Sequence, residues 1–303
     1  MGTDIRWEKD ITLHQDKEEE IYSLLLRQEG DLKEVIEKIP DKKAITLPLK
    51  PGTYNLDGYT IKNKKLTFKG LGEVNIIGSI NIEGSEVIFE NIKFEGISAK
   101  GSKVVFKNCK GKGIYGTASQ ITINNSEIHG NEERGIEVVE NSTLEIKDSK
   151  VYENGTKVKA YAHIYIENSK ADISNSQVYN GIGLRGIYGE ASHVTINNSE
   201  VYGHYSNGIY IFNSTLSMKG SQVYKNGAGE SQIDIYGKCQ VTVRDTHVYN
   251  SKGDYGIWIE KSGSKVELIN VKTWGNKYGL KCNEYGTSVK IQNCEFRDGT
   301  WGL

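Results

Sequence analysis

The sequence predicts an all-β solenoid of parallel strands, and two observations lead to this fold class. First, the stretch from Val194 to Thr215, VTINNSEVYGHYSNGIYIFNST, recurs with small changes on both sides of itself, and such a period is typical of stacked supersecondary units. Second, its small or apolar residues alternate with polar ones at period two, which indicates strands. They form three short segments: Val194 and Ile196, Ser199 and Val201, Ile209 and Ile211. Three strands per coil predict a triangular solenoid.

The repeat can be followed through most of the chain. From Ile121 onward, successive coils begin 23, 27, 23, 22, 25, 25 and 23 residues apart. The predicted coil starts are Leu66, Val87, Val104, Ile121, Leu144, Ala171, Val194, Leu216, Val241, Val266 and Val289. We therefore expect about eleven coils in one domain, because a solenoid grows by adding coils.

One corner of each coil, between the first and second strands, carries Asn or Asp. The residues are Asn91, Asn108, Asn125, Asp148, Asn175, Asn198, Asp245, Asn270 and Asn293, and Gly220 replaces them once. These residue types tolerate the left-handed backbone of a tight corner, and their stacked side chains can form a hydrogen-bonded ladder. With this motif, residues 44–303 resemble the right-handed parallel β-helix family, the pectate-lyase-like superfold. The resemblance implies a single-stranded right-handed β-helix and no particular activity.

Residues 1–43 do not belong to the repeat, and we expect them to form a helical cap on the β-helix of residues 44–303. Asp16-x-x-Glu19 and Asp31-x-x-Glu34 are typical of capping boxes. Each precedes a helical pattern of apolar residues: Ile21, Leu24 and Leu25, then Leu32, Val35, Ile36 and Ile39. An amphipathic helix can cover the open core and strand edges of a first coil. A docking helix for another chain is the alternative.

The other end of the sequence, Trp301, Gly302 and Leu303, stops midway through a coil. An uncovered end of this kind exposes strand edges. We therefore expect that the chain is a fragment of a longer protein or that a second subunit packs there by self-association.

The four cysteines are expected to be free thiols. Cys109 and Cys294 occupy an inward slot that Ser fills in other coils, and Cys282 occupies an inward slot of the third strand. Buried thiols commonly act as small apolar groups. No CxxC motif is present, so neither a zinc site nor any other metal or cofactor is expected.

Composition argues against several classes of partner. The net charge of -1, with Lys and Glu interspersed, argues against nucleic acid. No run of 18 apolar residues is present, which argues against a membrane partner. The start, MGTDIRWEKD, lacks the apolar core of a secretory signal, so the sequence favours a cytoplasmic protein or one whose leader has been removed.

Two outward columns of aromatic residues are the predicted binding surface. The second strands contribute His129, Tyr152, Tyr179, Tyr202, Tyr224, Tyr249 and Trp274. The third strands contribute Tyr165, Tyr188, Tyr210 and Trp258, interrupted by Glu137 and Asp234. Such rings can stack as a stabilising ladder, or they can present a rigid platform to a sugar or a protein surface. Extra residues also gather between the second and third strands, at 155–162, 225–231 and 250–254, where solenoids place binding loops and tolerate neutral insertions.

Catalysis has one weak candidate site. Glu230 and Asp234 from one coil and Asp254 from the next form the best acidic cluster, and paired carboxylates suit glycoside hydrolysis. The sequence has no Asp-Asp dipeptide and no Arg-x-Lys motif, and the arginines of the coils are scattered. An ordinary solvated acidic surface explains the cluster equally well.

The sequence thus predicts a non-catalytic recognition or scaffolding module that binds a polysaccharide or a protein along the aromatic columns. One alternative is a polysaccharide lyase, glycoside hydrolase or epimerase with an atypical acidic site. Another is a structural spacer within a larger protein.

Overall fold

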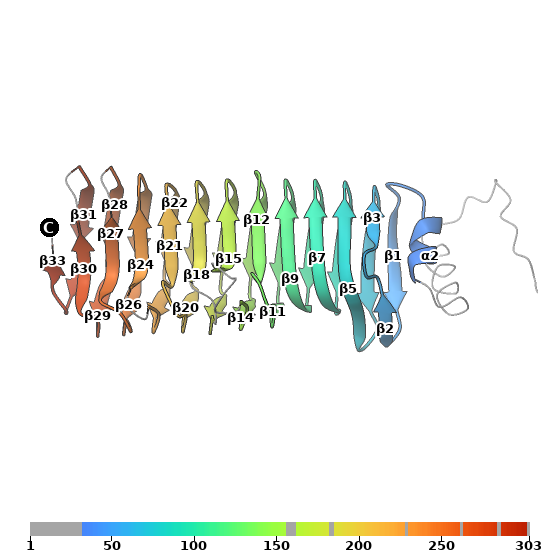
Figure 1. Ribbon diagram of the computed structural model, residues 1–303, viewed down its shortest axis with the longest axis horizontal. Helices are drawn as coiled ribbons and strands as arrows, with labels where there is room; N and C mark the ends of the chain where they lie inside the picture. The colour runs from blue at the N-terminus through green and yellow to red at the C-terminus, as the bar shows by residue number, and fades with distance from the viewer. Residues whose placement is uncertain are drawn as a thin grey trace, which may run out of the picture.

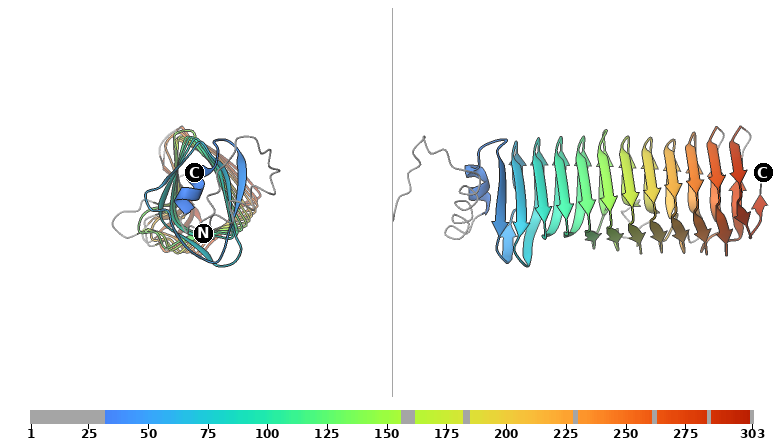
Figure 2. Two further views of the ribbon diagram at one scale, coloured as in Figure 1. Left: turned by 90° about the vertical axis from the view of Figure 1, so that its right-hand side faces the viewer. Right: turned by 180° about the vertical axis from the view of Figure 1, so that it is seen from behind.

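The computed structural model describes residues 32–155, 162–181, 185–227, 230–260, 263–283 and 286–301. Within these residues the chain forms a rod of stacked coils, seen from the side in Figure 1 and along its axis in Figure 2. The first predicted capping helix and most of the loop 155–162 lie outside the described residues.

The first strand of each coil belongs to one long parallel sheet of twelve strands. In order along the rod, the strands are β1 (Ala44–Leu49), β4 (Lys65–Gly70), β6 (Glu86–Glu90), β8 (Lys103–Lys107), β10 (Gln120–Asn124), β13 (Thr143–Lys147), β16 (Lys170–Ser174), β19 (His193–Asn197), β22 (Thr215–Lys219), β25 (Gln240–Arg244), β28 (Lys265–Ile269) and β31 (Ser288–Gln292). The predicted coil starts pair with one another in register; Ala171, for example, faces Leu144 on one side and Val194 on the other. The predicted repeat is therefore confirmed.

From β10 onward each coil has two further short strands. The second strands are β11 (Glu127–His129), β14 (Lys150–Tyr152), β17 (Gln177–Tyr179), β20 (Glu200–Tyr202), β23 (Gln222–Tyr224), β26 (His247–Tyr249), β29 (Lys272–Trp274) and β32 (Glu295–Phe296). The third strands are β12 (Ile136–Val139), β15 (Ala162–Glu167), β18 (Arg185–Glu190), β21 (Ile209–Phe212), β24 (Ser231–Tyr236), β27 (Tyr255–Glu260), β30 (Tyr278–Cys282) and β33 (Thr300–Trp301). Both sets pair in parallel from coil to coil.

The early coils differ from the predicted three-strand pattern. The first coil has separate second and third strands, β2 (Gly52–Asn55) and β3 (Thr60–Lys62). In each of the next three coils, one continuous strand takes the place of both: β5 (Val74–Glu83), β7 (Lys93–Lys100) and β9 (Lys110–Thr117). The coil starts Val87, Val104 and Ile121 lie only 17 residues apart, so these coils have no residues to spare for a loop at that corner. The corner loop begins after β11.

The predicted corner residues have left-handed backbone conformations, with φ of 48° at Asn198 and 61° at Gly220. Their side chains hydrogen-bond from coil to coil in places. Nδ2 of Asn108 donates to Oδ1 of Asn91 at 3.1 Å, and Nδ2 of Asn125 donates to Oδ1 of Asn108 at 2.6 Å. The predicted asparagine ladder is therefore confirmed.

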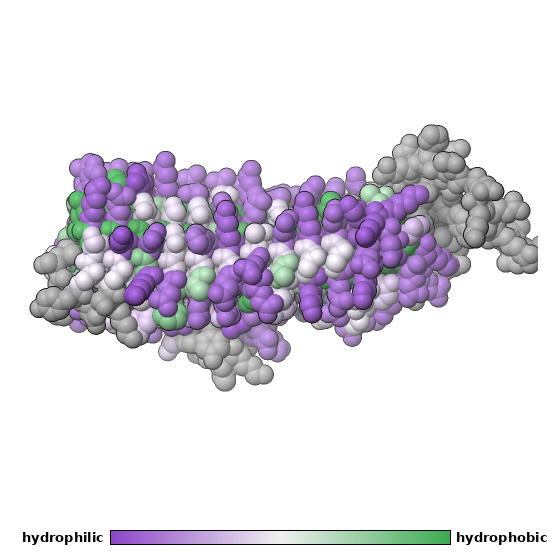
Figure 3. Space-filling view, turned by 90° about the horizontal axis from the view of Figure 1, so that it is seen from above, coloured by the Kyte–Doolittle hydropathy of each residue, from purple (hydrophilic) through white to green (hydrophobic). Residues whose placement is uncertain are grey.

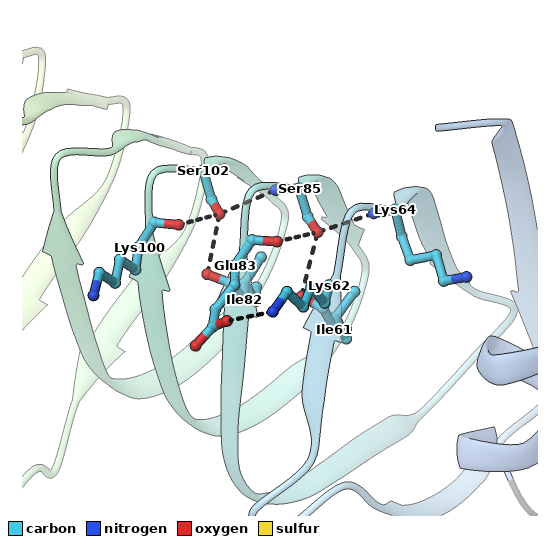
Figure 4. Close-up of polar contacts among 8 residues, drawn as sticks. All are labelled: Ile61, Lys62, Lys64, Ile82, Glu83, Ser85, Lys100 and Ser102. Carbon is cyan, nitrogen blue, oxygen red and sulfur yellow. Dashed lines mark hydrogen bonds and ion pairs between the residues drawn. The ribbon is translucent and has the colours of Figure 1, made fainter. Parts of the chain in front are cut away.

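Buried serines satisfy backbone groups on the inside of the corners (Figure 4). The backbone N–H of Ser85 donates to Oγ of Ser102 at 3.2 Å, and the Ser102 hydroxyl donates to the carbonyl of Lys100 at 2.9 Å. The same arrangement repeats in further coils, so polar backbone atoms that would otherwise be orphaned in the core find partners. Stacking in register also places similar side chains in rows along the rod (Figure 3).

The second predicted capping helix is present. Helix α2 (Leu32–Lys38) lies over the end of the coil stack in Figure 2 and buries Leu32, Val35 and Ile36 in the same apolar core as the coils. The helix thus covers the first coil, as expected. In the described residues, no helix is long and apolar enough to cross a membrane.

All four cysteines are free, as predicted. Cys109, Cys239 and Cys282 are buried, and Cys294 is partly exposed. Burial raises the pKa of the Cys109 thiol to about 11, so the group stays protonated and unreactive at neutral pH.

Candidate functional site

The second-strand ladder, which consists of His129, Tyr152, Tyr179, Tyr202, Tyr224, Tyr249 and Trp274, is a continuous stack. Neighbouring ring centroids lie 4.4 to 5.0 Å apart, with interplanar angles of 5° to 9°. Each inner ring therefore covers its neighbours' faces and presents its edge and its polar tip outward. The rings are half-buried.

Hydrogen bonds fix several tips of this ladder. The hydroxyl of Tyr152 donates to Oε2 of Glu127 at 3.1 Å, and that of Tyr224 donates to Oε2 of Glu200 at 3.2 Å. Burial and the Glu127 carboxylate raise the pKa of Tyr152 to about 12. The hydroxyl groups are thus protonated donors that are already engaged by the protein.

The third strands carry a shorter stack, which we term the tyrosine strip: Tyr165, Tyr188 and Tyr210. Their centroids are 5.1 and 5.2 Å apart, with interplanar angles of 4° and 6°. The hydroxyls of Tyr165 and Tyr188 donate to Glu167 and Glu190 at 3.1 and 2.9 Å. Burial raises the pKa of all three tyrosines, so they remain hydrogen-bond donors at physiological pH.

Two arginines lie on the rings of this strip. Cζ of Arg134 is 4.0 Å from the centroid of Tyr165, and Cζ of Arg185 is 4.2 Å from that of Tyr210. Cation–π contacts of this kind hold a guanidinium group in place at the protein surface. The strip therefore combines aromatic rings, carboxylates and oriented guanidinium groups. This combination was not evident from the sequence, in which the arginines of the coils are scattered.

Asp234 continues the strip in register, between Tyr210 and Trp258. Although its position is on the outward column, its residue is only 4 % exposed. Nδ2 of Asn207 donates to its Oδ2 at 3.3 Å. Burial, followed by the charges of Glu260 and Glu230, raises the pKa of Asp234 to about 8, against the lowering effect of Arg185. The carboxyl group is therefore mostly protonated at neutral pH.

The predicted acidic cluster is only partly assembled. Glu230 acts electrostatically on Asp234 and accepts a short hydrogen bond from the Ser206 hydroxyl. Asp254 instead pairs with Lys277 at 3.3 Å and is half-exposed. Glu260, which faces Tyr236 in the preceding coil, is the larger charge acting on Asp234. The proximity of Glu260 to Asp234 depends on how the two coils pair across the intervening loop. The spacing of the residues in the sequence therefore did not reveal it.

Two histidines meet inside the solenoid, a pair that sequence reasoning missed. The rings of His163 and His204 are fully buried, 5.0 Å apart and nearly perpendicular. Nε2 of His204 contacts the carbonyl of Val178 at 3.0 Å, as Nδ2 of Asn226 contacts that of Val201. His204 thus occupies a slot that Asn fills in the next coil. Burial lowers the pKa of His163 to about 4 and that of His204 well below its ordinary value.

Among the described residues, no group of three or more His, Cys, Asp or Glu side chains is arranged to hold a metal ion.

Comparison with known proteins identifies the fold family. A family model described as "Right handed beta helix region" matches residues 53–188 and 185–302. No curated protein matches the sequence. Among solved structures, the A-module of the Azotobacter vinelandii mannuronan C-5 epimerase AlgE4 aligns with a TM-score of 0.58 at 12% identity, covering 86% of this chain and 89% of that chain.

Two further structures align similarly. The A-module of the Azotobacter vinelandii epimerase AlgE6 gives a TM-score of 0.56 at 13% identity, covering 90% of this chain and 96% of that one. The periplasmic alginate epimerase AlgG gives 0.55 at 13% identity, covering 95% of this chain and 89% of that one. At these identities the likeness concerns the fold.

Proposed function

The chain belongs to the right-handed β-helix family, and we propose that it is a non-catalytic recognition module that binds a polysaccharide along the tyrosine strip. The observation that carries this proposal is the repetition of one set of groups in successive coils: a ring, a hydroxyl donor and a carboxylate, at Tyr165 with Glu167 and at Tyr188 with Glu190. A repeating array of donors and acceptors matches a ligand that itself repeats.

The spacing supports an extended polymer. The ring centroids of the strip lie 5.1 and 5.2 Å apart in successive coils, so the strip presents the same groups at a short, regular interval along the rod. Because the rings cover one another's faces, the contacts available to a glycan are edges, hydroxyls and carboxylates, together with the guanidinium groups of Arg134 and Arg185. Arg offers several donors in a rigid fork, which suits sugar hydroxyls and carboxylates.

The comparisons add support at the level of fold. The aligned epimerases are named for alginate or mannuronan, which are polysaccharides. A β-helix provides a long, rigid, repetitive surface, and a polysaccharide is long enough to use it.

Affinity electrophoresis in gels that contain single polysaccharides, both neutral and uronate-rich, tests the proposal. We expect at least one polysaccharide to retard the protein, and Tyr188→Ala combined with Tyr210→Ala to remove the retardation. Tyr179→Ala combined with Tyr202→Ala in the second-strand ladder is the matched control, because it removes two similarly stacked rings. Equal losses of binding and of thermal stability in both double variants would assign the strip a structural role only.

Asp234 favours a second candidate function, a polysaccharide lyase, hydrolase or epimerase. A carboxyl group that is protonated at neutral pH is the kind of group that general acid catalysis requires, and Tyr210 and Arg185 stand beside it. Its burial opposes this role, because a substrate reaches it only if covering side chains move. New reducing ends, unsaturated products or changed sugar stereochemistry, abolished by Asp234→Asn, would favour the enzyme; unchanged polysaccharide would favour recognition.

A further inference from the structure

Two adjoining hollows open on the early part of the rod, where the short coils meet the longer ones. Their volumes are about 730 and 560 Å³, and they share Glu95 and Lys112 as lining residues. The cause is the change in coil length. Strands β7 and β9 run on without a loop, whereas the loop after β11 projects and places Asn131 and Arg134 beside the second hollow. We term the two together the step hollow.

The step hollow exposes apolar and aromatic surface. Five large apolar or aromatic side chains in the described residues are notably exposed, and Ile77 at 36 % and Tyr115 at 40 % line this hollow. His129 also lines the hollow and is the first ring of the second-strand ladder. Tyr152 covers one face of the His129 ring, with the centroids 4.7 Å apart. The preceding coil has Lys112 at this position, so it supplies no ring to cover the other face. The hollow therefore offers flat and aliphatic surfaces to a ligand.

Six of the eight Lys, Arg and Glu residues that line the hollow are paired with one another, and Lys93 pairs with Glu73 outside it. Lys110 lies 3.2 Å from Glu127, Lys112 lies 3.6 Å from Glu95, and Arg134 lies 2.6 Å from Glu137. An anionic ligand would have to break these pairs and would meet their carboxylates. A neutral ligand rich in hydroxyl groups can bond to the pairs as they stand, because each pair presents both donors and acceptors.

We propose that the step hollow is a binding site for a neutral oligosaccharide. Apolar faces of its sugar rings pack on Ile77, Tyr115 and the end of the ladder, while its hydroxyls bond to the ion pairs. The inference rests on the proposed function for the ligand class only. The residues that line the step hollow do not include Tyr188 or Tyr210. The hollow adjoins the tyrosine strip, because Tyr115, Glu137 and Tyr165 pair in register in three successive coils.

Isothermal titration of the full chain with cellohexaose, mannohexaose and hexamannuronate tests the site. We expect one of the neutral hexasaccharides to bind and hexamannuronate to bind more weakly. Ile77→Ser and Tyr115→Ala should each weaken the neutral interaction about tenfold or more, which corresponds to about 1.4 kcal/mol. Matched controls are Ile291→Ser and Tyr205→Ala, because these side chains are 40 % and 56 % exposed and do not line the hollow.

The outcomes separate this site from the strip. Loss of binding in Ile77→Ser and Tyr115→Ala but in neither control supports the hollow, whatever the strip variants do. Binding that survives both hollow variants and disappears in the Tyr188 and Tyr210 double variant overturns the hollow and leaves the proposed function standing. Tighter binding of hexamannuronate that is itself weakened by Ile77→Ser and Tyr115→Ala, or no binding of either neutral sugar, also overturns the inference.

Discussion

The guanidinium group of Arg185 lies over the ring of Tyr210, one coil further along the rod, with Cζ 4.2 Å from the ring centroid. Nε of the same arginine donates to Oδ1 of Asn207 at 3.3 Å, and Asn207 in turn donates to Asp234. One cation thus connects the tyrosine strip to the buried carboxyl group.

Arg185→Ala should weaken polysaccharide binding and lower the stability by about 0.5 to 2 kcal/mol, the range of a cation–π contact. It should also raise the pKa of Asp234 further, because Arg185 is a charge that lowers it. Binding assays and urea denaturation measure the first two effects. Arg244→Ala, whose arginine is half-exposed and pairs with Glu267, is the control and should leave binding intact. Equal affinity of the two variants would remove Arg185 from the binding surface.

Asn198→Val should destabilise the protein by about 1 to 3 kcal/mol, because a β-branched residue resists the left-handed region in which Asn198 lies, with φ of 48°. Asn198→Gly keeps access to this region and should cost much less. Urea denaturation of both variants measures the difference. Similar stabilities of the valine and glycine variants would contradict the role given to the corner backbone.

Asp234→Asn should change the pH dependence of stability. The carboxyl group has a pKa of about 8 in the folded chain and an ordinary value of 3.8, so the folded chain holds the proton more tightly. Its contribution is complete below pH 3.8 and is lost as the pH rises through 8. The asparagine variant should therefore gain stability relative to the native chain as the pH rises, as thermal unfolding at a series of pH values can show. A constant difference between the two proteins would contradict the assigned pKa.

His204→Asn tests the buried histidine pair in acid. The pKa of His163 is about 4 against an ordinary 6.5, so the unfolded chain binds more protons than the folded chain between these values. Stability should fall as the pH decreases through this window, and His204 adds to the loss because its pKa is also lowered. Asparagine at position 204 is the residue type that Asn226 supplies at the equivalent position of the next coil, and it should reduce the acid sensitivity of the stability. His193→Asn, at an exposed position, should not; an identical acid response of both variants would contradict the account.

Much of the fold could be predicted from the sequence, because each coil repeats the same local requirements. A left-handed backbone favours Asn, Asp or Gly, and these residues recur at the corner between the first and second strands, so Asn198 and Gly220 mark corners directly. Inward positions alternate with outward ones, so the register of Tyr188 with Tyr210 also follows from the pattern. The merging of the second and third strands in the early coils was not predicted, although the 17-residue spacing of Val87, Val104 and Ile121 accounts for it.

The candidate site was less predictable, because its properties depend on contacts between coils. The sequence does not show that stacked rings cover one another's faces, nor that Asp234 is buried while Asp254 pairs with Lys277. His163 and His204 are separated by a coil, and Gly181 leaves space between them: a Cβ there would lie 2.4 Å from Nδ1 of His204 and 3.0 Å from Nε2 of His163. That combination requires the three-dimensional arrangement.

The dependence of affinity on glycan length tests most directly the central claim that a repeating surface binds a repeating polymer. The measurement is titration of the native chain with a series from the disaccharide to the octasaccharide of whichever polysaccharide retards it in affinity electrophoresis. The account predicts that affinity rises with each added sugar until the strip is spanned, and that the rise is lost in the Tyr188 and Tyr210 double variant. Saturation of affinity at the disaccharide, or a rise that persists in the double variant, would contradict it.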